Sequence, residues 1–182
     1  MRDIDRDGLA LCRLQALLFE NSPDTATCSS PIFVRRFMNS EAARRMDNPS
    51  FLDGSDSPAS LMAEVEEQYG PSTYGKVRYG AEVLHWMGYL YRYWAYTREW
   101  PSSQVYQAMP ARELAKLYQP YHSLDPDQAI ARIEEAKGLL PAEDLTARGV
   151  EALRRIRAQS GFDYATVNLC GETAEHTHPS TP

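Results

Sequence analysis

Several patterns that identify common protein classes are missing from this chain of 182 residues. Its three cysteines, Cys12, Cys28 and Cys170, lie far apart and form no CxxC pair. An odd number at such spacing indicates neither a disulfide framework nor a zinc site, so we expect free thiols in a reducing cytoplasm. The first twenty residues place three aspartates before any apolar run, which is not the order of a secretory signal and also favours a cytoplasmic protein.

Motifs with high specificity for catalysis are missing as well. The chain has neither the GxSxG turn of serine hydrolases nor a glycine-rich loop for phosphate. His176 and His178 lie near the carboxyl end without further ligands beside them, so they do not predict a metal site. We therefore predict no catalytic residue, no metal and no cofactor, and a protein that is not an enzyme.

The chain carries fewer positive than negative side chains. It has 19 lysines and arginines and 25 aspartates and glutamates, which gives a formal net charge of −6. Binding to a phosphate backbone needs a basic face, so nucleic acid is not the expected partner. The longest apolar stretch, within residues 76–100, is interrupted by Arg78, Glu82 and Arg92, which excludes a membrane span there. We therefore expect the partner to be a protein. The composition does not predict the number of subunits.

What the chain does have is a dense aromatic segment. Residues 76–100 contain all three tryptophans and five of the eleven tyrosines, and no proline. Apolar positions recur there at steps of three and four residues, the period of one helical face, and further aromatic residues extend the apolar surface around the helix. A helix that is apolar nearly all round is usually buried by its neighbours. We predict a central core helix over about residues 76–99.

Start and stop signals divide the remainder of the chain into further helices. Ser29-Ser30-Pro31, Ser57-Pro58 and Asp125-Pro126 each place a capping side chain before a proline. With helical spacing, these signals predict helices at about 4–20, 31–38, 40–46, 58–69, 102–109, 110–119, 126–137 and 141–160. The expected fold is all-α: a single compact multi-helix domain over residues 1–162 and an extended or disordered tail over 163–182, with at most one short strand near 164–169.

Arg92 is a candidate binding residue because aromatic side chains surround it in the sequence. Tyr89, Tyr93 and Tyr96 lie within four residues of it. Arginine stacks on aromatic rings and presents a planar fork to carboxylates, and clusters of this composition dominate the binding energy of interfaces. These four residues are predicted to contact a partner or ligand. The alternative is a core helix in which Arg92 pairs with a buried acid or extends to the surface.

Arg35 and Arg36, in the segment SSPIFVRRFMNSE, form a second candidate site. They point about 100° apart on a helix, so at most one follows its apolar face. They could contact the acidic face of a partner or an anionic ligand. The alternative is a pair of solvated arginines whose stems pack on Phe33 and Phe37.

His122 is a candidate because Asp125 follows it by three residues, as an orienting acid would follow a general base. Asp125 is also explained as a helix cap, and nothing else in the sequence completes a nucleophilic triad. His122 is therefore kept as a binding candidate rather than a catalytic one.

Two segments together resemble a known group of proteins. SSPIFVRRFMNSEAARRMD (29–47) and GYLYRYWAYTREWPSSQVYQAMPARELAKLYQPYHSLDPDQAIARI, within residues 87–135, are similar to small bacterial proteins, some of which look like antitoxins encoded beside a toxin. The resemblance implies a protein that works by binding, and it carries over no catalytic residue.

The favoured function is thus a cytoplasmic antitoxin-type protein that binds and neutralises a co-encoded toxin. Shape complementarity with aromatic and arginine anchors would suffice for that role. Two alternatives stay open. A helix-turn-helix-like DNA-binding regulator would use the helices at 31–46, and a small enzyme would combine His122, Arg92 and an acid in an aromatic pocket.

Overall fold

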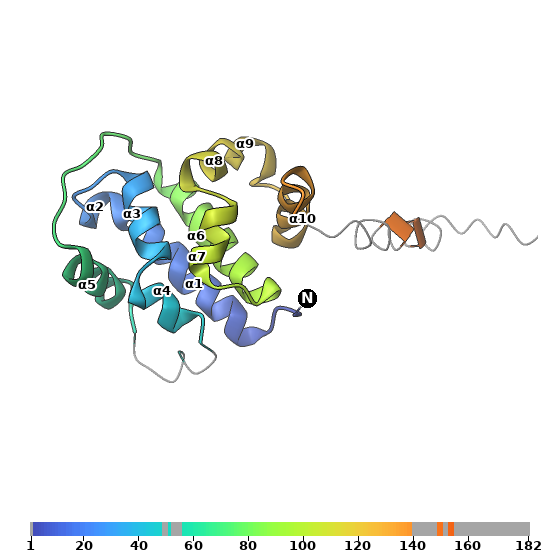
Figure 1. Cartoon of the computed structure of the whole chain (residues 1–182), viewed down its shortest axis with the longest axis horizontal. Coiled ribbons are helices and arrows are strands. Elements are labelled where there is room, and N and C mark those ends of the chain that lie inside the picture. The colour runs from blue at the N-terminus through green and yellow to red at the C-terminus, as the bar shows by residue number, and fades with distance from the viewer. Residues whose placement is uncertain (1, 49–50, 52–55, 140–148, 151–152, 155–182) are drawn as a thin grey trace, which may run out of the picture. The chain divides into compact units, whose positions relative to one another are not determined.

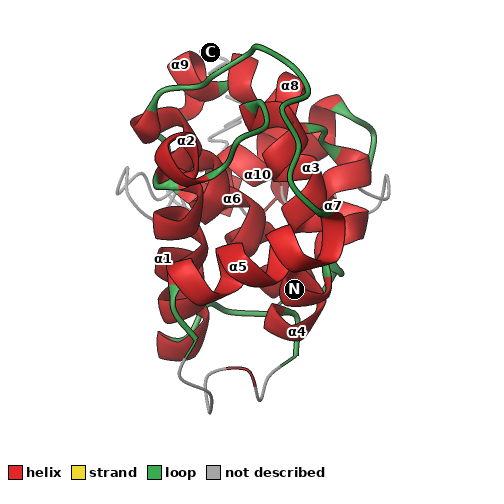
Figure 2. Ribbon diagram, turned by 90° about the vertical axis from the view of Figure 1, so that its left-hand side faces the viewer, coloured by secondary structure: helices red, strands yellow, loops and turns green. Residues whose placement is uncertain are grey.

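The computed structural model describes residues 2–48, 51, 56–139, 149–150 and 153–154. These residues contain ten helices and no strand, so the predicted all-α fold is confirmed (Figures 1 and 2). The helices are α1 (Arg6–Glu20), α2 (Ser22–Thr25), α3 (Ser30–Met38), α4 (Glu41–Met46), α5 (Pro58–Tyr69), α6 (Ala81–Arg98), α7 (Ser102–Ala108), α8 (Ala111–Lys116), α9 (Tyr118–Tyr121) and α10 (Pro126–Ala136).

The chain divides into two units, Met1–Leu139 and Leu140–Pro182. All ten helices belong to the first unit, and the four described residues of the second are helical. The rest of the predicted helix at 141–160 lies outside the described residues. The predicted domain boundary after residue 162, the predicted tail and the predicted strand near 164–169 also lie outside them.

Helix α6 is the centre of the first unit, as the aromatic segment predicts. It contacts α1, α7, α8, α9 and α10, and its longest contact is with α1. Gly88 makes that contact close: a Cβ atom at this position would lie 2.7 Å from the carbonyl oxygen of Gln15 and 2.9 Å from Cα of Ala16. Two helices can approach this closely only where one of them lacks a side chain. In Figure 1, α5 and α10 lie on opposite sides of α6.

The predicted start of this helix, at residue 76, is wrong. Helix α6 begins at Ala81 after Gly80, and Val77 is 45% exposed rather than part of the inner face. The segment before it is extended because its backbone bonds to the start of α3: Ser30 N donates to the carbonyl of Val77 at 2.9 Å, and Tyr79 N donates to the Ser30 hydroxyl at 3.0 Å. Those hydrogen bonds replace the first helical turn.

Most other helix boundaries follow their capping signals. Ser57 forms a capping box with Ser60 at the start of α5, and the Asp125 carboxylate accepts from Asp127 N at the start of α10. The predicted end of the first helix at residue 20 is confirmed, and the separate short helix α2 then runs through Pro23. The predicted helix at 110–119 is divided into α8 and α9, and α9 runs through Pro120. Within a first helical turn the missing N–H of proline has no intrahelical partner to lose, so both prolines are tolerated.

A buried carboxylate attaches α10 to α6. Glu134, 1% exposed, accepts from Trp94 Nε1 at 2.9 Å and from Arg98 Nε at 2.8 Å. The Nη2 atom of Arg98 bonds the second carboxylate oxygen at 2.9 Å, so the pair is bidentate.

Cys12 and Cys28 are buried free thiols, as expected, whereas Cys170 lies outside the described residues. None of the helices in the described part of the chain has both the length and the apolar character needed to cross a membrane.

Candidate protein-interaction site

Helix α6 places the candidate residues on two different faces. Arg92 points inward and is 1% exposed, whereas Tyr89, Tyr93 and Tyr96 are half-buried on the outer face. The spacing of 89, 93 and 96 puts those three on one side of a helix. Tyr89 and Tyr93 therefore do not share the surroundings of Arg92, whereas Tyr96 lines one cavity together with it.

Each of the three nitrogens of the Arg92 guanidinium has a hydrogen-bond partner inside the protein. Its Nε donates to Gln15 Oε1 at 2.8 Å, Nη1 donates to Asp47 Oδ1 at 2.6 Å, and Nη2 donates to the Ser102 hydroxyl at 3.0 Å. These partners come from α1, from the residue after α4 and from the first residue of α7. The alternative prediction, an arginine of the core helix paired with a buried acid, agrees with this arrangement in the pairing, although Asp47 is an exposed residue.

Asp47 holds the network together because it bonds both the arginine and a helix start. Its Oδ2 accepts from Ser102 N at 2.9 Å, and its Oδ1 also accepts from the Ser102 hydroxyl at 2.6 Å. A carboxylate at a helix start complements the positive end of the helix dipole. This network connects four elements, and each nitrogen of the Arg92 guanidinium makes a hydrogen bond within it.

The Cys12 thiol does not offer a nucleophile beside this network. Burial raises the pKa of Cys12 to about 12, even though the nearby charge of Arg92 acts in the opposite direction. A thiol with so high a pKa stays protonated at neutral pH and is unreactive.

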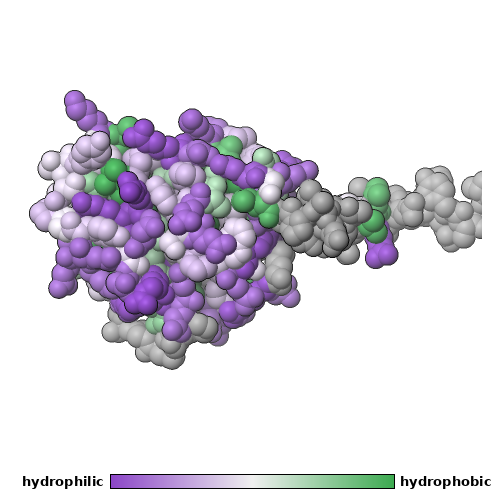
Figure 3. All heavy atoms as spheres, in the orientation of Figure 1, coloured by the Kyte–Doolittle hydropathy of each residue, from purple (hydrophilic) through white to green (hydrophobic). Residues whose placement is uncertain are grey.

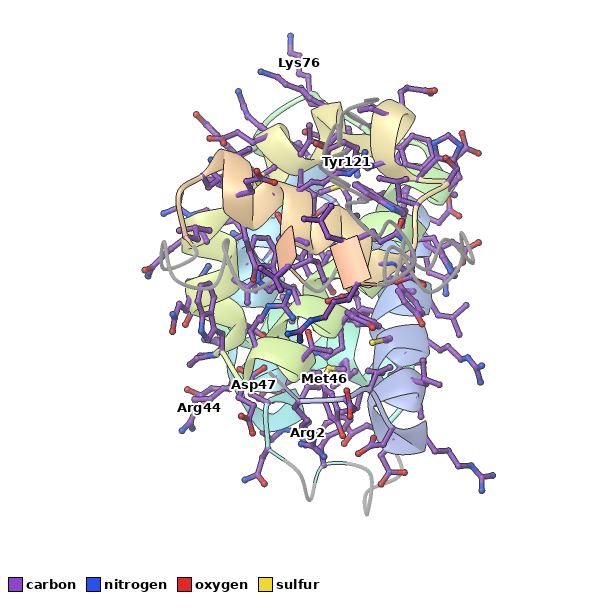
Figure 4. All side chains as sticks on the ribbon, turned by 90° about the vertical axis from the view of Figure 1, so that its right-hand side faces the viewer. Arg2, Arg44, Met46, Asp47, Lys76 and Tyr121 are labelled. Atoms are coloured by element: carbon purple, nitrogen blue, oxygen red, sulfur yellow. The ribbon has the colours of Figure 1, made fainter. Side chains whose placement is uncertain are left out.

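A cavity of about 220 Å³ opens next to Asp47, and Arg2, Met46, Tyr96 and Trp100 also line it. Figure 4 shows Arg2, Met46 and Asp47 close together, with Arg44 directed outward. Arg92 lines the cavity too. Two polar groups of the lining are engaged: Arg2 lies 4.1 Å over the Tyr96 ring, and the Tyr96 hydroxyl donates to Asp5 Oδ1 at 2.6 Å. Tyr96 is thus committed to the amino-terminal segment.

The outer face of α6 carries a row of aromatic rings that continues onto α9. Tyr89 stacks on Tyr93 with ring centroids 6.3 Å apart, and Trp86 lies edge-on to Tyr118 at 5.7 Å. The ring of Tyr118 in turn stacks on His122 at 4.9 Å. We call these five residues the aromatic strip. All but the exposed His122 are half-buried, so their rings are positioned by the fold and still reach the surface.

Charged side chains surround the strip. Partial burial is the main cause of the raised pKa values of Tyr89 and Tyr93, and the charges of Asp125 and Asp127 raise the pKa of Tyr93 further. The charge of Arg13 acts in the opposite direction on the pKa of Tyr89. Both phenols are therefore neutral at physiological pH, and neither hydroxyl forms a hydrogen bond within the described part of the chain. They remain available as donors and acceptors for another molecule.

His122 belongs to the strip and is not one of the hydrogen-bond partners of Arg92. Its Nδ1–H donates to the carbonyl of Tyr118 at 3.0 Å, which fixes the ring against Tyr118. Asp125 is used as the cap of α10, and none of the partners of Arg92 is a histidine. The proposed pairing of His122 with Asp125 has no hydrogen bond between the two residues in the described part of the chain.

Arg35 and Arg36 lie apart from the strip, in a groove of about 560 Å³ between α3, the end of α5 and α7. Ile32, Asn39, Tyr69, Tyr106 and Gln107 complete its lining. We call it the arginine–tyrosine groove. The structure therefore separates the candidates into three places: the groove, the strip, and the buried network of Arg92.

Helices α3 and α4 follow one another after a tight turn, as a helix-turn-helix would. The arginines of α4, however, are paired with acids: Arg44 Nε bonds Glu41 at 2.7 Å, and Arg45 bonds both Asp56 and Glu64. Pairing of this kind removes the free positive charge that a phosphate backbone requires.

No known protein family, curated protein or solved structure matches this chain. No cluster of three or more His, Cys, Asp or Glu side chains suited to a metal ion occurs among the residues that the structure describes. The geometry of the three places described above is thus the basis for a functional proposal.

Sequence reasoning missed several members of these sites. The step of four residues from Tyr118 to His122 could have indicated a shared helical face, and Trp86 is three residues before Tyr89. No local sequence signal predicts that Tyr69 and Tyr106 line the groove. They come from α5 and α7 and meet α3 only in the folded chain.

Proposed function

We propose that this chain is an antitoxin-type interaction protein, which binds a co-encoded toxin in the cytoplasm and blocks the toxin's active site. The observation that carries the proposal is the aromatic strip, a preformed row of rings on the outer face of the most firmly anchored helix. Tryptophan and tyrosine supply much of the energy at protein interfaces, because they bury a large area at low cost in side-chain entropy.

The polar surface of the molecule suits a protein partner. The face drawn in Figure 3 is mostly hydrophilic, with small separate apolar areas. Protein interfaces that form and dissociate combine such a polar surface with a few aromatic anchors. The strip has the free tyrosine hydroxyls and the nearby acids Asp125 and Asp127 to orient a partner around those anchors.

Neutralisation needs no chemistry from this chain. A rigid helix that fills or covers the substrate cleft of a toxin excludes substrate by occupancy alone. Rigid aromatic anchors lower the entropy lost on binding, because the rings are already ordered by stacking on each other.

The proposal is tested by growth of a bacterial host that expresses the protein encoded beside this chain. We expect that protein to arrest growth when expressed alone and growth to recover when this chain is co-expressed. The variant Tyr89→Ala/Tyr93→Ala should lose the rescue, whereas Tyr74→Ala, which removes a tyrosine that is 74% exposed outside the strip, should retain it. A neighbour that never arrests growth, or arrest that this chain does not relieve, would contradict the proposal.

A further inference from the structure

The arginine–tyrosine groove holds its two arginines in different ways. Arg36 is fixed, because its Nη1 donates to the carbonyl of Gly70 at 2.9 Å and its guanidinium lies 5.5 Å from the centre of the Tyr69 ring. Arg35 is exposed, and its guanidinium forms no hydrogen bond or ion pair with any residue that the structure describes. One fork is therefore preorganised and the other is free to close on a ligand.

The wall of the groove is preorganised too. The Tyr69 hydroxyl donates to the carbonyl of Asn39 at 3.0 Å, and the Asn39 amide donates to the carbonyl of Arg35 at 2.7 Å. These bonds connect the end of α5 to the end of α3. A ligand that enters the groove meets side chains whose positions are already set, which lowers the cost of binding.

The groove carries uncompensated positive charge. Partial burial raises the pKa values of Tyr69 and Tyr106, but the charges of Arg35 and Arg36 act to lower that of Tyr69, and those of Arg35 and Arg112 act to lower that of Tyr106. The acid that reaches this region is Glu41, whose carboxylate is bonded to Arg44. The groove is thus a positive site on a chain whose net charge is −6.

We propose that the arginine–tyrosine groove binds an acidic segment of a protein partner, with a carboxylate held by Arg35 and Arg36 and an adjacent apolar side chain against Ile32 and Tyr106. This inference rests on the proposed function, since it names the chemistry of a second contact with the partner. Planar guanidinium forks match carboxylates in a bidentate manner, and flanking tyrosines supply apolar area.

A protein segment fits this site better than a nucleic acid does. Nucleic-acid binding uses many phosphate contacts along an extended basic surface. Here the neighbouring arginines of α4 are paired with Glu41, Asp56 and Glu64, so α3 and α4 together do not form an extended basic surface. Two forks in a groove of about 560 Å³ suit one or two carboxylates with a bulky neighbour.

The test is selection of phage-displayed random dodecapeptides on the immobilised full chain, followed by affinity measurement with the labelled peptides. We expect enrichment of sequences that place Asp or Glu beside an apolar residue. Their dissociation constants should rise at least about tenfold with Arg35→Gln/Arg36→Gln, because each lost charge-assisted pair is a major contact. Arg6→Gln/Arg132→Gln should bind as the wild type does, since it removes the same two positive charges at exposed sites outside the groove.

Three results would overturn the inference. The first is a selection that enriches no acidic peptide, and the second is a set of selected peptides that bind the Arg35→Gln/Arg36→Gln chain as tightly as the wild type. The third is a single-stranded dodecanucleotide that binds the wild type as tightly as the peptides do and no longer binds the same variant. The Tyr89→Ala/Tyr93→Ala chain should bind the peptides unchanged. If growth rescue fails while peptides still bind the groove, the proposed function alone is rejected. If growth rescue succeeds while no acidic peptide binds, the proposal for the groove alone is rejected.

Discussion

Arg92 and Arg35 are arginines on apolar helices with opposite surroundings. Arg92 is buried with a carboxylate, an amide and a hydroxyl around its guanidinium, and Arg35 is exposed with no such partner among the described residues. An arginine with hydrogen-bond partners inside the protein stabilises the fold, and one without them is free to bind another molecule. Its aromatic neighbours in the sequence do not decide between the two. The two regions can therefore be tested by separate measurements of stability and affinity.

The Arg92 network is expected to affect stability most when only one member of the Arg92–Asp47 ion pair is removed. A buried ion pair with good geometry contributes modestly, because desolvation of both charges offsets their attraction. Removal of one partner leaves the other charge buried without compensation, which is far more destabilising. Asp47 is the member whose loss affects both Arg92 and the start of α7.

The largest effect is expected from Asp47→Ala, which removes the acid paired with Arg92 and leaves it only the neutral partners Gln15 and Ser102. We expect the free energy of unfolding to fall by about 3–5 kcal/mol, because a buried guanidinium loses its counter-charge. Urea unfolding followed by circular dichroism measures this quantity. Arg35→Ala is the matched control and should change it by less than about 0.5 kcal/mol. A loss below about 1 kcal/mol in Asp47→Ala would show that the network does not hold the fold.

The next largest effect is expected from Gly88→Ala, which disturbs the close contact that brings Gln15 to Arg92. The added Cβ would lie 2.7 Å from a backbone oxygen of α1, so the helices must move apart. Overpacking of this kind lowers the free energy of unfolding by about 1–3 kcal/mol. Gly80→Ala is the control, because its Cβ would meet nothing nearer than 3.7 Å. Equal thermal stability of the two variants would contradict the close packing of α1 on α6.

The smallest effect is expected from the exposed counterpart of the Arg92–Asp47 pair, Asp5 with Arg2. The pKa of Asp5 is lowered to about 2, first by the hydrogen bond from Gly8 N and then by the Tyr96 hydroxyl. Because the folded pKa lies below the unfolded value near 3.8, this contribution to stability is present above about pH 4 and is lost as the pH falls towards 2. Carboxyl NMR titration of Asp5, with Asp5→Asn as the reference, measures it. A midpoint near 4 would show that the cap does not form in solution.

The sequence predicted the helices well because their signals are local. Ser57-Pro58 and Asp125-Pro126 begin α5 and α10 where predicted, since capping depends on residues within one turn. The start of α6 was wrong because the backbone of residues 77–79 bonds to Ser30, a contact that no local signal records.

The site was less predictable for the same reason. Arg92 is separated in sequence from Gln15 by 77 residues and from Asp47 by 45 residues. Nothing near Arg92 in the sequence indicates those partners, so its aromatic neighbours suggested an interface instead. Tyr89 and Tyr93 were predicted because they flank Arg92 in the sequence, and His122 because Asp125 follows it by three residues. Only folding brings Tyr118 between Trp86 and His122.

Isothermal titration calorimetry of the purified chain with the protein encoded beside it tests the central claim most directly, that the outer face of α6 binds while its inner face holds the fold. The account predicts a saturable complex with the wild type. Its dissociation constant should rise at least about tenfold for Tyr89→Ala/Tyr93→Ala, with cooperative unfolding retained. A wild-type titration without binding, or a double variant that binds as tightly as the wild type, would contradict it.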